Sequence, residues 1–304
     1  MLLLAALLIC QAEPETACIG PDRPPKSDSA KQVELTPSGG IVLQVNARDN
    51  GTKSLWVRSC VALREGTLEM LACRRGTKEH ESIVAIDETA AAVQAGLLAA
   101  GFEQGTPARF QPDFVPPTGE RLRITMHWQD GGEWASRDSK DLIRNAISGW
   151  HGADLPKAIA DAVALPTESI RIRYVEIDER LIFEGSMTDA ERKTLDALSD
   201  DPTYRAAVAS LRRAGTPRPV TFDWVFAGST WSEAVDGSRT FDAESGNLIC
   251  VANFSDAIID ISELSSASSG AQLYEPYTER VPPIGTVVWL HIERDADATK
   301  PAAE

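Results

Sequence analysis

The residues from 121 to 129 alternate between apolar and polar side chains. The apolar positions are Leu122, Ile124, Met126 and Trp128. This period of two predicts a half-buried strand, and Asp130-Gly131-Gly132 predicts a tight turn after it. Short apolar runs predict further strands at 41–45, 55–63, 67–73 and 82–86. The segment 64–66 can turn the second and third of these into a hairpin.

Helical signals are concentrated in two parts of the chain. Residues 89–100 are rich in Ala and Leu and close at Gly101, which predicts a helix with a glycine stop. Between 150 and 216 the pattern predicts helices at 154–165 and 202–213, a strand around 170–174, and a helix opened by the capping box Thr188–Glu191. This stretch is therefore predicted to be an inserted α+β subdomain.

The second half of the chain repeats a spacing of the first half. The strand ending at Ile86 lies 30 positions before Pro116, and the strand ending at Val251 lies 31 positions before Pro282; both prolines open a Pro-Pro-x-Gly turn. The predicted fold class is α+β and β-rich. Two pseudo-repeated strand–helix–loop–strand halves would share one barrel or sandwich core, with a double-psi-like barrel as one candidate.

The N-terminal residues resemble an export signal. The apolar run 2–10 is too short to span a membrane, and no later run is longer. It matches the hydrophobic part of a Sec-type signal peptide at 1–12, although no Lys or Arg follows Met1. A lipid anchor is not expected, because Ile9 stands where a small residue should precede Cys10. We therefore expect a protein that is exported, either periplasmic or secreted.

The predicted order of segments after the signal peptide follows from composition. Residues 13–38 hold several prolines and no apolar period, which is typical of a flexible linker. The β-rich core is expected at 39–149 and 217–295, interrupted by the subdomain at 150–216. A disordered tail is expected at 296–304.

Composition and charge narrow the classes of partner. The 304 residues are 43% hydrophobic and 25% charged, which are globular proportions. The formal net charge of −15 disfavours nucleic acid and anionic membranes. The expected partner is an unidentified protein or small-molecule ligand outside the cytoplasm.

Cysteine spacing limits the cofactors. Four cysteines follow the predicted cleavage site: Cys18, Cys60, Cys73 and Cys250. Three full pairings are open, and Cys73 with Cys250 is a candidate pair because each lies in a strand pattern. No two of them form a CxxC pair, and neither a Gly-rich phosphate loop nor a haem motif occurs. The cofactor stays unknown, with no iron–sulfur, nucleotide or haem motif to indicate one.

Several segments in order resemble one protein family. They are LREGTLEMLACRRGTKEHES at 63–82, AGLLAAGFEQG at 95–105, FQPDFVPPTG at 110–119, DLIRN at 141–145, WVFAGS at 224–229, LICVANF at 248–254 and RVPPIGT at 280–286. This string is similar to the YdjY-domain family of exported or membrane-associated bacterial proteins, many of them planctomycete. The resemblance covers 40–145 and 220–292 and implies no established reaction. Relatives pass almost directly from the IRN segment to WVFAGS, which agrees with an insertion at 150–216.

The densest set of ionisable groups is Lys78, Glu79, His80 and Glu81, next to the strand at 82–86. A carboxylate beside a histidine can orient or charge it, giving a general base or half of a metal site. The spacing is not H-E-x-x-H, and salt-bridged loops of this composition are common. We expect His80 to point inward and to anchor structure more than it performs chemistry.

Other candidates carry weaker signals. Ser229 in FAGST lacks the G-x-S-x-G spacing of a nucleophile, and Asp236, Asp242 and Glu244 lack the spacing of an EF-hand. Trp134 and Trp231 lie near loops, where an aromatic ring can stack on a sugar or peptide.

Two functions remain open from the sequence. The first is a non-catalytic binding or interaction module. The alternative is a metal-assisted enzyme with a site around Lys78–Glu81. The favoured hypothesis is the binding module, because the sequence contains no recognisable catalytic set.

Overall fold

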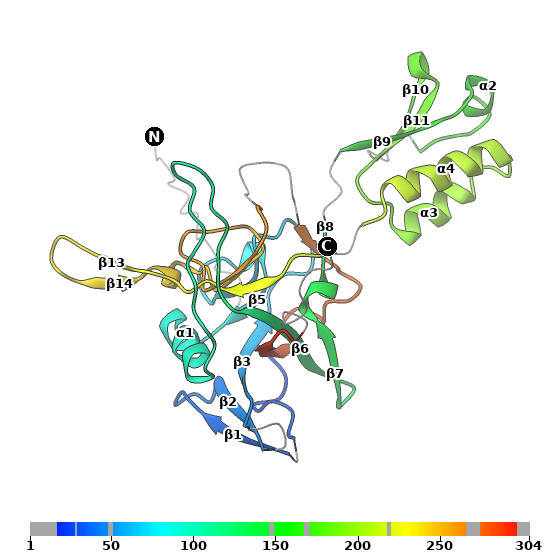
Figure 1. Cartoon of the computed structure of the whole chain (residues 1–304). Coiled ribbons are helices and arrows are strands. Elements are labelled where there is room, and N and C mark those ends of the chain that lie inside the picture. The colour runs from blue at the N-terminus through cyan, green and yellow to red at the C-terminus, as the bar shows by residue number, and fades with distance from the viewer. Residues whose placement is uncertain are drawn as a thin grey trace, which may run out of the picture.

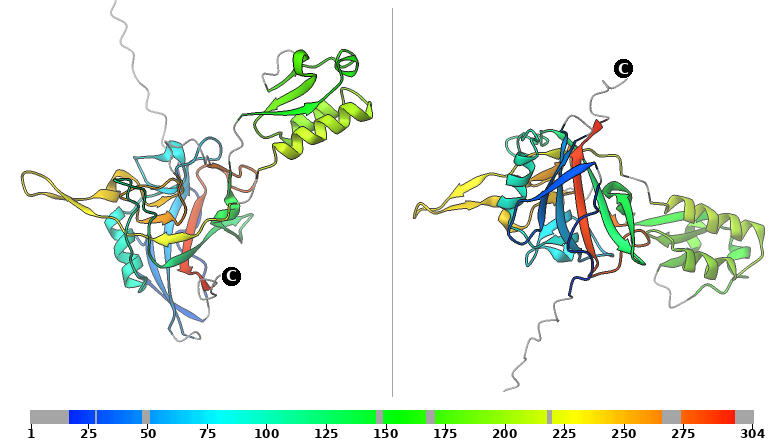
Figure 2. Two further views of the ribbon diagram at one scale, coloured as in Figure 1. Left: turned by 45° about the horizontal axis from the view of Figure 1, so that its top comes forward. Right: turned by 90° about the horizontal axis from the view of Figure 1, so that it is seen from below.

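The computed structural model describes residues 17–27, 29–47, 51–145, 149–166, 171–217, 220–265 and 274–296. A β-rich body occupies the centre of Figure 1, and a smaller unit made of residues 149–217 projects from one side of it. A two-stranded hairpin projects on the opposite side in both views of Figure 2. The predicted signal peptide and nearly all of the predicted tail lie outside the described residues.

The central body is built on an eight-stranded barrel. Its strands, in chain order, are β3 (Lys53–Val61), β4 (Met70–Arg74), β5 (Ser82–Ile86), β6 (Arg121–Asp130), β12 (Trp224–Phe226), β15 (Ile249–Cys250), β16 (Ile259–Ile261) and β18 (Val287–Arg294). Around the barrel the order is β3-β18-β6-β12-β16-β15-β4-β5, and pairing of β5 with β3 closes it. Closure removes the free strand edges that an open sheet would expose. The β-rich α+β class is confirmed.

Alternating side chains fill the barrel, as the sequence pattern of β6 predicts. Leu122, Ile124 and Met126 are buried in the core, where Trp224 and Leu290 join them from the second half of the chain. β18 pairs with β3 on one side and with β6 on the other. The core is therefore shared between residues far apart in sequence.

Among the described residues, α1 (Ala90–Ala99) is the helix that packs against the barrel. The helix begins at Thr89, whose side chain accepts a hydrogen bond from the Ala92 N–H, and Gly101 follows with a φ of +82°. The helix and its glycine stop agree with the prediction. A Cβ at Gly96 would lie 3.1 Å from side-chain atoms of Ile41 and Leu55, so the glycine allows the helix to lie close to the sheet.

The predicted hairpin of 55–63 with 67–73 is wrong. β3 does not pair with β4; it pairs with β2 (Ile41–Asn46), β18 and β5. β4 instead lies parallel to β5 and antiparallel to β15. The segment 64–66 therefore connects two strands, β3 and β4, that do not pair with each other. The turn residues at 64–66 do not indicate which strands β3 and β4 pair with instead.

The prediction of a flexible linker at 13–38 is also wrong for its described residues. Cys18 forms a disulfide with Cys60 of β3. The outer face of β18 is covered by this segment, where the Trp289 indole donates to the Pro21 carbonyl at 3.1 Å. Further on, β1 (Ala30–Glu34) pairs with β2 (Ile41–Asn46). The proline content of residues 13–38 suggested a flexible linker. The disulfide of Cys18 with Cys60 and the pairing of β1 with β2 instead hold the described residues of this segment against the barrel.

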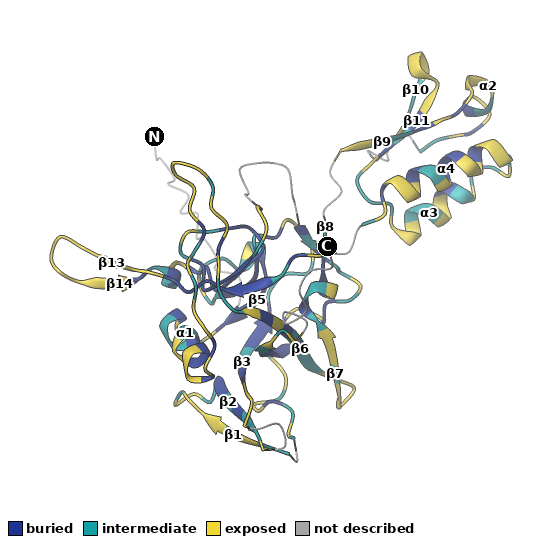
Figure 3. Ribbon diagram, viewed as in Figure 1, coloured by how far each residue is buried: buried dark blue, intermediate teal, exposed yellow. Residues whose placement is uncertain are grey.

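Residues 149–217 form a unit with its own apolar core. Its elements are β9 (Trp150–Asp154), α2 (Lys157–Ala160), β10 (Ile172–Val175), η3 (Glu176–Asp178), β11 (Arg180–Glu184), α3 (Asp189–Asp196) and α4 (Pro202–Ala214). The sheet order is β10-β11-β9, and the buried side chains include Phe183, Leu195, Tyr204 and Leu211. Figure 3 shows buried positions on the helix surfaces that face this sheet.

Two helices of this unit begin at the predicted positions, and a third does not. α3 opens with the capping box, in which Thr188 and Glu191 bond each other's backbone N–H. α4 begins at Pro202 after the N-cap Asp201. The helix predicted at 154–165 is reduced to α2, because Trp150–Asp154 pairs with β11 and Leu155-Pro156 follows it.

The remaining elements lie around the barrel. They are β7 (Glu133–Asp138) beside β6, β8 (Ile143–Asn145) paired with β17 (Tyr274–Pro276), the hairpin of β13 (Trp231–Glu233) and β14 (Arg239–Phe241), and three 3-10 turns, η1 (Glu79–Glu81), η2 (Ser139–Leu142) and η4 (Asp242–Ser245). The β8–β17 ladder lies at the base of the 149–217 unit.

Candidate functional site

The predicted site at Lys78–Glu81 lies on the surface. Glu79–Glu81 is a 3-10 turn directly before β5. The His80 side chain is 77% exposed, and its Nε2 lies 3.8 Å from a Glu81 carboxylate oxygen. The expectation that His80 points inward is therefore wrong. A 3-10 turn puts consecutive side chains in different directions, which carries His80 away from the core.

The neighbours of His80 form a structural network. Lys78 Nζ lies 3.4 Å from Glu81 Oε1, 4.0 Å from Glu69 Oε2 and 4.4 Å from the centre of the Phe254 ring. Burial, with a smaller contribution from Glu81, raises the pKa of the Glu69 carboxyl. Glu79 accepts a hydrogen bond from the Gly76 N–H. Across the described part of the chain, no three His, Cys, Asp or Glu side chains are grouped as metal ligands would be.

The cysteines pair differently from the candidate pair of the sequence. Cys73 and Cys250 are both free and buried, while Cys18 and Cys60 form the disulfide. Burial raises the pKa of both free thiols, so neither favours the reactive thiolate. The candidate disulfide between Cys73 and Cys250 is therefore not formed, because both thiols are free.

The weaker candidates do not converge on a site. Ser229 is buried and its N–H donates to Gln94. Asp242 accepts a hydrogen bond from Thr230, and Glu244 pairs with Arg74 at 3.2 Å. Trp134 and Trp231 are exposed on the β6–β7 and β13–β14 hairpins. The Ser229 hydroxyl is buried and has no hydrogen-bond partner among the described residues.

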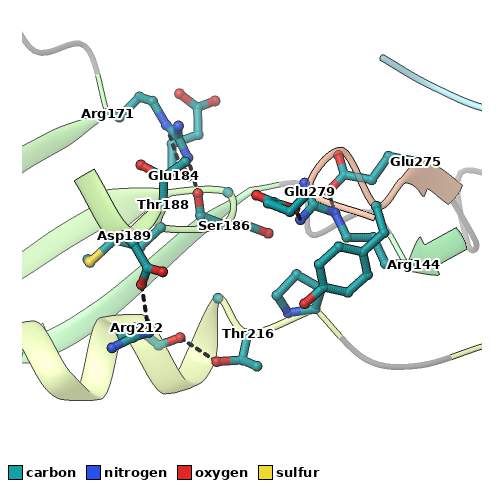
Figure 4. Close-up of a pocket in the computed structure, with 15 residues that line it drawn as sticks. Arg144, Arg171, Glu184, Ser186, Thr188, Asp189, Arg212, Thr216, Glu275 and Glu279 are labelled. Atoms are coloured by element: carbon teal, nitrogen blue, oxygen red, sulfur yellow. Dashed lines mark hydrogen bonds and ion pairs between the residues drawn. The ribbon is translucent and has the colours of Figure 1, made fainter. Parts of the chain in front are cut away.

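A cleft of about 650 Å³ lies between the barrel and the 149–217 unit (Figure 4). We call it the neck cleft. Its barrel wall comes from β8 and from β17 with the residues after it: Arg144, Glu275, Tyr277 and Glu279. Its other wall comes from the end of β11, the start of α3 and the end of α4: Arg171, Glu184, Gly185, Ser186, Met187, Thr188, Asp189, Arg212, Gly215, Thr216 and Pro217. The volume is in the range of small-molecule sites.

Charged groups of both signs line both walls. On the barrel wall, Arg144 Nε lies 2.7 Å from Glu275 Oε1, and Arg144 Nη1 lies 3.7 Å from Glu279 Oε2. On the other wall, Arg212 Nη2 donates to Asp189 Oδ1 at 2.9 Å, as Figure 4 shows. Guanidinium and carboxylate groups in a concave site can bind polar ligands with good geometry.

Two groups complete the cleft. Arg171 pairs with Glu191 at 2.8 Å and donates to the carbonyls of Glu184 and Ser186, which fixes the loop after β11. Ser186 Oγ is buried and has no hydrogen-bond partner among the residues that the structure describes. A buried hydroxyl without a partner can satisfy a polar group of a ligand at low cost.

Sequence reasoning missed the neck cleft. Arg144, Arg212 and Glu279 are spread over more than 130 positions of the chain, and each is an ordinary charged residue in its local pattern. The signal that unites them is the β8–β17 ladder, in which Arg144 lies opposite Glu275. That pairing is not visible in either segment alone.

A buried carboxyl in the barrel was also missed. Asp260 of β16 is fully buried, and burial raises its pKa to about 8. Its Oδ1 accepts hydrogen bonds from the Asn253 amide at 3.0 Å and from the Ile261 N–H at 2.7 Å. Asp260 therefore carries a proton at neutral pH and fixes the loop between β15 and β16.

Comparison with known proteins gives one result. No curated protein matches the chain, and no solved structure does. The family model of the YdjY domain matches residues 48–150, which include β3 to β8 and α1. The resemblance read from residues 220–292 lies outside this match and stays a prediction. Residues 48–150 therefore carry a YdjY domain.

Proposed function

We propose that this protein is a non-catalytic binding module outside the cytoplasm and that its ligand binds in the neck cleft. The observation that carries the proposal is the cleft itself, where the β8–β17 ladder and the 149–217 unit together present three guanidinium groups, several carboxylates and the Ser186 hydroxyl. The metal-assisted alternative at Lys78–Glu81 has less support, because His80 faces solvent and its neighbours pair with one another.

Location outside the cytoplasm is supported by the disulfide between Cys18 and Cys60. Disulfides persist in oxidising compartments and are rare in the cytosol. In the described residues, none of the helices is both long and apolar enough to cross a membrane. The predicted signal peptide at 1–12 is the means of export in this proposal.

We infer further that 39–149 and 217–295 act as one scaffold that carries the insertion 150–216. The barrel has an internal symmetry when β3 is matched with β12, β4 with β15, β5 with β16 and β6 with β18. Exchanging the members of each match leaves the set of barrel pairings unchanged. The two parallel pairs, β4–β5 and β15–β16, are exchanged with each other. This symmetry supports two pseudo-repeated halves. It matches β5 with β16, which comes later in the chain than the 247–251 strand indicated by the spacing.

A thermal-shift screen tests the proposed function. The panel contains amino acids, short peptides, dicarboxylates and oligosaccharides, and each is measured with the wild type and with Arg144→Gln/Glu279→Gln. We expect at least one class to raise the melting temperature of the wild type and to lose most of that shift in the double variant. The ligand should be recovered chemically unchanged.

The matched control is Lys78→Gln/Glu81→Gln, which also removes one charge of each sign. It should respond to the ligand as the wild type does. An equal shift in wild type and Arg144→Gln/Glu279→Gln, or conversion of the ligand to a product, would contradict the proposed function.

A further inference from the structure

In each wall of the neck cleft, arginine side chains form ion pairs with carboxylates of the same wall. Arg144 is paired with Glu275 and Glu279 of its own wall, and Arg212 is paired with Asp189 of its own wall. Within the described residues, none of the ion pairs joins one wall to the other. The charges at the rim are accessible: the side chains of Arg212 and Glu279 are 45% and 65% exposed.

This pairing determines which ligand charge the cleft accepts. An anion that bound Arg144 or Arg212 would draw the guanidinium from its carboxylate and leave that carboxylate without a partner. A cation that bound Glu279 or Asp189 would draw that carboxylate from its arginine and leave the guanidinium without that partner. This cost is greatest for Arg144 and Glu275, whose side chains are 18% and 26% exposed, and it is small for the exposed pair of Arg212 with Asp189. A ligand that brings both signs offers a new partner to a guanidinium group and to a carboxylate of the cleft at once.

Stacking offers little to a sugar in this cleft. Among the described residues that line the cleft, Tyr277 has the single aromatic ring. Its ring already contacts two guanidinium groups, those of Arg144 at 5.1 Å and Arg280 at 3.9 Å from the ring centre. The other apolar lining groups are the aliphatic side chains of Met187 and Pro217. Recognition here therefore depends on charge and hydrogen bonds.

We propose that the neck cleft binds a zwitterion that carries a protonated amine and a carboxylate, such as a short peptide with free ends. Its carboxylate binds Arg212, its ammonium group binds Glu279 on the opposite wall, and a peptide group between them bonds the unpartnered Ser186 hydroxyl. This inference rests on the proposed function and names the ligand class of that site.

Calorimetric titration at low salt with four probes tests the inference. Triglycine has both charges, N-acetyl-triglycine has the carboxylate alone, triglycine amide has the amine alone, and maltotriose has neither. We expect triglycine to bind the wild type at least tenfold more tightly than the other three. Arg212→Gln and Glu279→Gln should each weaken triglycine binding at least tenfold.

Two matched variants control for loss of charge alone. Arg205→Gln removes an exposed arginine of α4 that does not line the cleft, and Glu233→Gln removes an exposed glutamate of β13. Both should bind triglycine as the wild type does. Circular dichroism of all four variants should match the wild type, because each substitution is at an exposed side chain.

The outcomes separate this inference from the proposed function. Tighter binding of maltotriose or of a singly charged probe, lost in Arg212→Gln or Glu279→Gln, would overturn the zwitterion and retain the neck cleft as the site. Triglycine binding that survives both variants would overturn the assigned contacts. Failure of all four probes to bind would overturn the inference alone if another class in the thermal-shift panel binds and loses its shift in Arg144→Gln/Glu279→Gln. Failure of every class in that panel as well would overturn the proposed function.

Discussion

The barrel and the 149–217 unit bury their apolar side chains in different ways. In the barrel, β18 lies between β3 and β6, so residues near 290 pack beside residues near 57 and 126. In the unit, every strand and helix comes from one continuous stretch of chain. The difference is one of sequence separation. Local signals describe the unit well, whereas the barrel depends on pairings between distant segments.

The same difference separates the two candidate sites. Lys78–Glu81 gathers four ionisable groups in consecutive positions, yet they form a surface turn. The neck cleft gathers Arg144, Arg212 and Glu279 from distant elements into one concave site. Density of charge along the chain is therefore a weaker guide to a site than convergence of charges across the fold.

Matched Leu→Ala substitutions should separate the two apolar cores. Leu290 is buried in the barrel core and Leu211 in the core of the 149–217 unit. Each substitution should cost about 2–5 kcal/mol of the stability of its own core, because it removes buried methyl groups and leaves a cavity. Hydrogen exchange with mass spectrometry should show faster exchange in β3 and β6 for Leu290→Ala and in α4 and β9 for Leu211→Ala. Faster exchange in both regions for either variant would show one cooperative unit.

Removing the disulfide should weaken the barrel alone. Cys18 and Cys60 are separated by 42 positions, and cross-linking a loop of this length stabilises a fold by about 2–4 kcal/mol. We expect Cys18→Ser/Cys60→Ser to lose that much free energy of unfolding in a urea titration and to increase exchange in β18. The exchange of α3 and α4 should not change. A urea midpoint equal to that of the wild type would contradict this role of the N-terminal segment.

Local motifs account for the parts of the fold that were predicted well. The Thr188–Glu191 capping box and the Asp201-Pro202 start of α4 are complete within a few residues, so they could be read directly. The alternation of β6 reflects its own two faces. By contrast, the partners of β3 are β2, β5 and β18, and Arg64-Glu65-Gly66 says nothing about them. The predicted hairpin failed for this reason.

The candidate site shows the same limit. Proximity in sequence brought Lys78, Glu79, His80 and Glu81 together, but the turn that contains them directs His80 to solvent. Asp260 was missed because a single aspartate in an IDI strand pattern does not reveal the loop that buries it. Arg144 and Glu275 become neighbours only through strand pairing.

The buried carboxyl of Asp260 predicts that the stability of the barrel depends on pH. The pKa of Asp260 is raised from its ordinary value of 3.8 to about 8 in the fold. The protonated carboxyl therefore stabilises the barrel fully below pH 4, and this contribution is lost as the pH rises through 8. Asp260→Asn keeps an acceptor for Asn253 and Ile261 and does not titrate. The stability of the variant relative to the wild type should rise with pH between 5 and 8, by up to about 1.4 kcal/mol per pH unit.

Urea titrations of both proteins from pH 5 to 8 measure this difference. Burial also lowers the pKa of His127 to about 4 and of His291 to about 3, which reduces stability as the pH falls below 6.5. Those imidazoles are present in both proteins, so their effect cancels in the comparison. A stability difference between Asp260→Asn and the wild type that is constant across this range would contradict a buried, protonated Asp260.

The smallest expected effect is that of His80→Ala, where sequence and structure disagree most directly. An inward imidazole would cost about 1–3 kcal/mol on removal, because a buried partner would lose its hydrogen bond. The exposed imidazole of the structure should cost less than about 0.5 kcal/mol. Lys78→Ala is the matched contrast, because the Lys78 side chain is only 24% exposed and contacts Glu81 and Phe254. In urea titrations at pH 7, Lys78→Ala should therefore be the more destabilised of the two. A larger loss of stability for His80→Ala than for Lys78→Ala would contradict the exposed imidazole and indicate that His80 is buried. Lys78–Glu81 would then be the better candidate for a functional site.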